Sequence, residues 1–161
     1  MKSIFISLDF SENATCAAKI AADVAQSTNA RLILFHQFRT CTNKATEKDQ
    51  FVESERYVQQ RLDKLARILQ KNRKVSISRL IKPYSGSEDL LAVARLLQVN
   101  LVIICDTNPS DKVSTTVSDH PSMPTVTVST TSPIDEPALG KLIRDQMYKL
   151  GSLANPLPET L

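Results

Sequence analysis

The sequence predicts an α/β protein with a doubly wound, five-stranded parallel sheet, and three observations lead to this fold class. Five short segments are almost continuously apolar, which is typical of strands buried on both faces. Segments with apolar residues at helical spacing lie between them. Strand and helix alternate along the chain, and right-handed crossovers then place helices on both faces of one sheet.

The first strand–helix–strand unit is predicted over residues 3–38. SIFISL (3–8) is the first strand, Ser11 caps the helix that follows, and ARLILFHQF (30–38) is the second strand. Asn29 suits the left-handed conformation that ends a helix. Small residues along one side of the helix would let it lie close to the sheet. They are Ala14, Ala17, Ala18, Ala21, Ala22 and Ala25.

The middle of the chain continues the alternation. Thr46 and Asp49 form a possible capping box for a second, long helix whose apolar positions extend to Leu69. KVSISRLI (74–81) is the predicted third strand. A third helix with inward-facing leucines follows it, and NLVIIC (100–105) is the fourth strand.

PTVTVS (124–129) is the predicted fifth strand, and an amphipathic helix follows it. Asp135 is the expected cap of this helix, and Gly151 is its expected end. We therefore divide the chain into an α/β domain over 1–131 and a C-terminal helix with a flexible tail over 132–161. The helix could either cover apolar surface or extend a dimer interface, and the sequence leaves both open.

Composition excludes several classes of protein. The chain of 161 residues is long enough for one domain with a core. Its net charge of +3 comes without a basic run interleaved with aromatics, so neither nucleic acid nor a membrane is an expected partner. No apolar run approaches the roughly 20 residues that span a bilayer. The three cysteines, Cys16, Cys41 and Cys105, have no metal-ligand spacing. We expect a reduced, cytoplasmic location and no metal.

Three stretches of the chain resemble the universal stress protein family. IFISLDFSENATCAAKIAADVAQSTNARLILFHQF (4–38) is similar to the family's opening, in which a strand, an aspartate, a serine and an alanine-rich helix follow one another. LLAVARLLQVNLVIICDT (90–107) and SMPTVTV (122–128) are similar to its later strands. The resemblance implies a Rossmann-like fold of the adenine nucleotide alpha hydrolase type.

In nucleotide-binding members the aspartate that ends strand one contacts the adenosine, and backbone groups that end strand two hold the adenine. These positions are Asp9 and Gln37 here. After strand four the family has a glycine motif, because glycine lets backbone N–H groups approach phosphate oxygens. Its three glycine positions fall on Cys105, Asn108 and Ser118. This departure from the family motif argues against ordinary ATP binding, so we expect no cofactor and keep ATP as the disfavoured alternative.

Each candidate residue also has a structural interpretation. Asp9 could orient a ribose, but capping the first helix is the interpretation we favour. Ser114 and Thr115 belong to a hydroxyl cluster that could hold an anion, although a solvated loop is the more common case. His36 is expected to be a hydrogen-bonded core residue, and Cys105 a buried, inert thiol rather than a redox sensor.

The fifth strand suggests a partner. Members of the family commonly form dimers by pairing this edge strand with its twin, which implies an interface at Thr125, Val126, Thr127 and Val128. The alternative is an edge that the C-terminal helix covers. A regulatory protein is a further possible partner.

The functional prediction is a non-catalytic, dimeric module of the stress response that has lost ordinary ATP binding. The alternative is an atypical nucleotide or anion sensor that uses Asp9 and the hydroxyl-rich loop after strand four. A weak nucleotide hydrolase is the least favoured interpretation, because neither a general base nor a pair of metal-binding carboxylates is evident.

Overall fold

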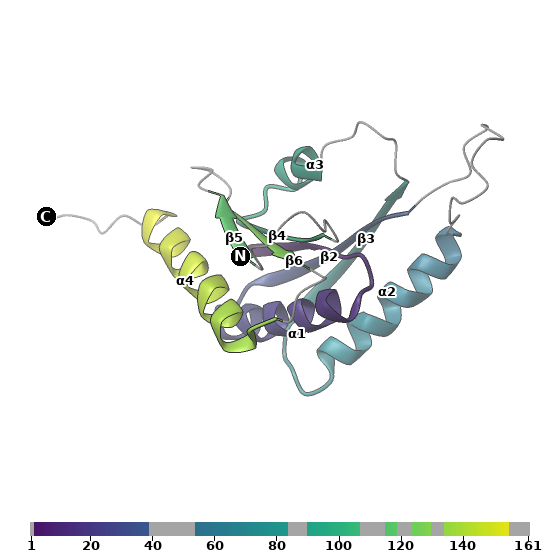
Figure 1. Cartoon of the computed structure of the whole chain (residues 1–161), viewed down its shortest axis with the longest axis horizontal. Helices are drawn as coiled ribbons and strands as arrows, with labels where there is room; N and C mark the ends of the chain where they lie inside the picture. The colour runs from purple at the N-terminus through teal and green to yellow at the C-terminus, as the bar shows by residue number, and fades with distance from the viewer. Residues whose placement is uncertain are drawn as a thin grey trace, which may run out of the picture.

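The computed structural model describes residues 2–38, 54–83, 90–106, 115–118, 124–129 and 134–154. Its elements form one sheet with helices on both faces (Figure 1). In chain order they are β1 (Ser3–Ser7), α1 (Glu12–Ser27), β2 (Arg31–Phe38), α2 (Glu55–Gln70), β3 (Ser76–Pro83), α3 (Leu90–Leu96), β4 (Leu101–Asp106), β5 (Thr115–Ser118), β6 (Thr125–Ser129) and α4 (Glu136–Ala154). No helix in these ranges is long and apolar enough to cross a membrane.

The strands lie in the order β3-β2-β1-β4-β6-β5. The first five in this order pair in parallel, which confirms the predicted five-stranded, doubly wound sheet. The sixth strand, β5, was not predicted, and it pairs antiparallel with β6. The chain winds outward from β1 toward β3 and then from β4 toward β5. The carboxyl ends of β1 and β4 therefore flank the position at which a doubly wound sheet binds its ligands.

The two faces of the sheet are covered unequally. Helices α1, α2 and α4 lie on one face, and the shorter α3 lies on the other (Figure 1). The larger core lies under the three helices, and the six alanines along one side of α1 are all buried in it, as predicted. A smaller core under α3 contains the rings of Phe5 and Phe35, which are tilted against each other with their centroids 5.1 Å apart.

Helix boundaries follow local capping. The Ser11 side chain accepts a hydrogen bond from the Ala14 backbone N–H at 3.1 Å, and Asn29 has a φ of 56°, as expected for a residue just after a helix. Helix α2 begins at Glu55, where the Ser54 side chain caps it. The capping box predicted at 46–49 lies outside the described residues.

Helix α4 is part of the main core. The Asp135 carboxylate accepts a hydrogen bond from the Ala138 N–H, as expected for the cap. Leu139, Ile143 and Met147 are buried together with the strands, so α4 covers apolar surface. The predicted end at Gly151 is wrong, because the helix continues to Ala154. The domain division at residue 131 stays a prediction, and residues 155–161 of the predicted tail lie outside the described residues.

The strand β6 is not an edge of the sheet. Thr125, Val126, Thr127 and Val128 lie between β4 on one side and β5 on the other, and both valines point into the core. The premise of the predicted interface, an exposed edge, is therefore wrong. The prediction failed because part of the segment expected to be a solvated loop forms β5, which pairs with β6 and covers its edge.

Candidate functional site

Asp9 follows β1 at the carboxyl edge of the sheet, and its two oxygens have different environments. Oδ1 accepts a hydrogen bond from the Ser11 backbone N–H at 3.0 Å, which fixes the turn into α1. Oδ2 is buried and has no hydrogen-bond partner among the described residues. One oxygen thus has the capping role predicted for Asp9, and the other remains available as an acceptor for a ligand.

Gln37 lies near the carboxyl end of β2, the strand next to β1. Its side-chain Nε2 is also buried without a partner in the described part of the chain. An unpartnered buried polar atom is costly in a folded protein, so a pair of them at one rim of a sheet points to a ligand or ordered water. Asp9 offers an acceptor, and Gln37 offers a donor.

Cys105 occupies the first glycine position of the family motif. Its side chain is 6% exposed and lies in the core beneath α1 and α4. Burial, and then the negative charge of Asp9, raises the pKa of the Cys105 thiol. The side chain is therefore a neutral thiol at neutral pH and a poor nucleophile, which favours the inert interpretation over redox sensing.

Backbone groups in the glycine-motif region belong to the sheet. Cys105 and Asp106 are the last residues of β4 and lie opposite Val128 and Ser129 of β6. Ser118, the third glycine position, lies in β5 opposite Thr125. Asn108, the second position, lies outside the described residues.

The predicted hydroxyl cluster, residues 114–116, lies only partly within the described residues. Ser114 lies outside the described residues, whereas Thr115 and Thr116 belong to β5. The prediction of a solvated loop is wrong for these two threonines. Their backbone pairs with β6, opposite Val128 and Thr127.

The sequence did not predict a cluster of Phe10, His36 and Arg61 that lies next to Asp9. Phe10 has a φ of 62°, which is rare for a bulky residue, and its ring centroid lies 4.5 Å from that of His36. The guanidinium of Arg61, a residue of α2, lies 4.3 Å from the centroid of the Phe10 ring. His36 Nδ1 donates to the Leu8 carbonyl at 2.7 Å, so the prediction of a hydrogen-bonded core histidine is confirmed. No local pattern links Phe10 to Arg61, because the two residues are far apart in the sequence.

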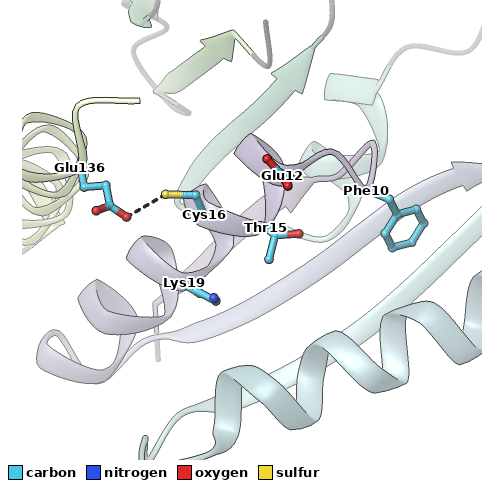
Figure 2. Close-up of a pocket in the computed structure, with 6 residues that line it drawn as sticks. All are labelled: Phe10, Glu12, Thr15, Cys16, Lys19 and Glu136. Atoms are coloured by element: carbon cyan, nitrogen blue, oxygen red, sulfur yellow. Dashed lines mark hydrogen bonds between the residues drawn. The ribbon is translucent and has the colours of Figure 1, made fainter. Parts of the chain in front are cut away.

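A surface cavity of about 350 Å³ lies at the junction of α1 and α4. Figure 2 shows the residues that line it: Phe10, Glu12, Thr15, Cys16, Lys19 and Glu136. The Cys16 thiol donates a hydrogen bond to Glu136 Oε1 at 3.0 Å. Asp9, Gln37 and Cys105 are not among the described residues that line the cavity, whereas Phe10, which follows Asp9 in the chain, is. Within the described ranges no three His, Cys, Asp or Glu residues come together in a way that could hold a metal ion.

Comparisons with known proteins agree with this fold. The model of the universal stress protein family matches residues 1–108. A solved universal stress protein in complex with cAMP superposes with a TM-score of 0.51 at 14% identity, over 69% of this chain and 77% of that one. The universal stress protein UspA from Lactobacillus plantarum gives a TM-score of 0.49 at 14% identity, over 79% of this chain and 97% of its own. A comparison with curated protein sequences gives no match.

Proposed function

The chain belongs to the universal stress protein family, and from this premise we propose that it is a non-catalytic regulatory module of the stress response that does not bind ATP in the ordinary way. One observation carries the proposal. Two of the three glycine positions, Cys105 and Ser118, lie inside paired strands and carry side chains. Phosphate binding of the family type requires a loop whose free N–H groups approach the phosphate oxygens closely.

Thermal melting in the presence of ATP and magnesium tests the proposal. A ligand that binds only the folded state, at about a hundred times its Kd, stabilises that state by about 2.7 kcal/mol. In a domain of this size the melting temperature would then rise by about 5 to 10 °C. We expect ATP to give no rise beyond the one that adenosine gives, because the phosphates find no binding loop. A saturable rise with ATP that adenosine does not reproduce, or ATP hydrolysis by the purified chain, would contradict the proposal.

A second function is favoured by the unpartnered atoms of Asp9 and Gln37. We propose that the rim of the sheet accepts a nucleoside-like ligand, with a hydroxyl of the ligand donating to Asp9 Oδ2 and a ring nitrogen or carbonyl accepting from Gln37 Nε2. A universal stress protein of similar fold is known in complex with cAMP, which adds support. This site would recognise the nucleoside, and phosphate groups on the ligand would add little to its affinity.

Melting with adenosine, AMP and ATP in parallel tests the second function. We expect similar shifts for all three ligands and loss of the shift in Asp9→Asn. That variant keeps an oxygen for the Ser11 N–H and replaces the free acceptor by a donor. Ser11→Ala is the control, because it removes the Oγ that caps α1 and leaves Asp9 Oδ2 in place. Absence of any shift with adenosine, or a shift that Asp9→Asn retains, would rule this site out.

Proteins of this family commonly form homodimers, and we propose self-association for this chain as well. Because β5 covers β6, the edge strand on this side of the sheet, within the described part of the chain, is β5 rather than the strand that contains Thr125, Val126, Thr127 and Val128. Two antiparallel β5 strands related by a two-fold axis would continue the sheet across the interface. Sedimentation over a range of concentrations measures the oligomeric state directly.

A further inference from the structure

The segment that contains α2 concentrates positive charge. Residues 55–74 include seven basic and two acidic side chains, so this segment has a net charge of +5. The whole chain has a net charge of +3, and all the remaining residues together therefore carry −2. The basic character of the protein comes from this one segment.

Four of the basic residues lie along or just beyond one face of α2. Arg56, Lys64 and Arg67 follow at intervals close to whole helical turns, so their side chains share this face, and Lys71 is the residue that caps the C-terminal end of the helix. All four side chains are exposed. The opposite side of α2 is buried against the sheet through Val58, Leu62, Leu65, Ala66 and Leu69. We call the four residues the basic stripe.

Nearby carboxylates do not neutralise the basic stripe. Asp63 pairs with Arg79 of β3 at 2.9 Å, and Asp23 of α1 pairs with Arg73 at 2.5 Å. Both acids are thus paired with cations outside the stripe. None of the four stripe residues has an ion-pair partner within the described part of the chain.

Two large apolar side chains border the basic stripe. Tyr57 is 46% exposed and Ile68 is 43% exposed. They are three helical turns apart, which places them in line on the same side of the stripe. Figure 1 shows α2 at the flank of the helical layer, at the end opposite α4. Exposed apolar groups beside a row of cations form a mixed surface of the kind that protein interfaces use.

We propose that the basic stripe, with Tyr57 and Ile68, is a docking surface for an acidic amphipathic helix of a partner protein. Carboxylates at intervals of three and four residues on such a helix would complement the four cations, and its apolar residues would cover Tyr57 and Ile68. A nucleic acid fits this surface less well, because its phosphate backbone has no apolar groups to cover Tyr57 and Ile68. A second copy fits poorly, because the exposed face of α4 mixes Glu136 and Asp145 with cations.

Binding of a labelled synthetic helix, with glutamates along one stripe and leucines beside it, tests the proposal by fluorescence anisotropy. The test variant is Lys64→Glu/Arg67→Glu/Lys71→Glu. The matched control, Lys141→Glu/Arg144→Glu/Lys149→Glu, makes the same change of net charge on exposed positions of α4. We expect affinity to fall about tenfold or more in the test variant and less than about twofold in the control. Melting curves of both variants establish that they fold.

Two further probes decide the class of partner. Duplex DNA and phosphatidylserine vesicles are each titrated into the unsubstituted protein under the same salt conditions as the peptide. Peptide binding is also measured for the variant Ile68→Ser. We expect Ile68→Ser to weaken peptide binding, since the apolar contact is part of the surface, while Leu96→Ser on α3 leaves it unchanged. Equal losses in the two triple variants, no effect of Ile68→Ser, or tighter binding of DNA or vesicles than of the peptide would overturn the proposal.

Discussion

Cys16 lies where α1 meets α4, and its thiol donates a hydrogen bond to Glu136. The pKa of Cys16 is raised from 9.0 to about 11. Burial of the thiol is the largest cause, followed by its hydrogen bond to Glu136 and the negative charge of that residue. A cysteine of this kind reacts slowly at neutral pH, because only the thiolate is a good nucleophile.

The raised pKa of Cys16 predicts a pH dependence. The folded chain keeps this proton between about pH 9 and 11, where the unfolded chain has lost it, so the contribution to stability is complete below pH 9 and is lost as the pH rises through 11. Glu136→Gln removes the nearby charge and should lower the pKa. We expect alkylation by iodoacetamide, measured against pH in a Cys41→Ser background, to shift to lower pH in that variant. An unchanged profile would mean that Glu136 does not influence the thiol.

Single residues differ in how far the sequence predicts them. Asp9 and Ser11 are placed correctly because capping depends on immediate neighbours in the chain. The burial of His36 follows from the apolar strand around it, although its partner, the Leu8 carbonyl, is 28 residues away. The free Oδ2 of Asp9 could not be predicted, because it depends on which groups from other strands approach it. Phe10 gives no warning of its positive φ, and its stacking on Arg61 requires that the chain first bring α2 beside α1.

At the scale of elements, helices and long strands are predictable and short pairing strands are not. Four helices and five parallel strands carry enough apolar residues at a regular spacing to identify them. Strand β5 has four residues, TTVS, and its conformation depends on pairing with β6. The position of α4 was also open, because amphipathic spacing shows that a helix must be covered and does not show by what.

The packing of α4 predicts a large difference between two of its residues. Ile143 is fully buried in the core, whereas Tyr148 is 60% exposed. We expect Ile143→Ala to lower the free energy of unfolding by about 2 to 5 kcal/mol, since it leaves a cavity among the strands and α1. Tyr148→Ala should change it by no more than about 0.5 kcal/mol. Urea denaturation measures both, and similar values for the two variants would mean that α4 is not docked on the core.

At the scale of the whole molecule, fold and chemistry give different kinds of information. Parallel pairing and doubly wound order follow from alternation along the chain, and the family match over residues 1–108 agrees with them. The chemistry of the rim does not follow from the fold, since Cys105 and Ser118 stand in paired strands and carry side chains at positions that correspond to glycines in the motif of nucleotide-binding members. The surface charge of α2 is a third, independent property, because exposed positions are free to vary without changing the core.

The place of α4 in the chain has a consequence for how the protein is made. Every strand that the structure describes precedes α4, and yet Leu139, Ile143 and Met147 of α4 complete the larger core. A chain still on the ribosome therefore presents an open apolar face until residues beyond 147 have emerged. Chaperones that bind exposed apolar surface would meet this intermediate during translation. The chaperone would release the chain when α4 docks on the core.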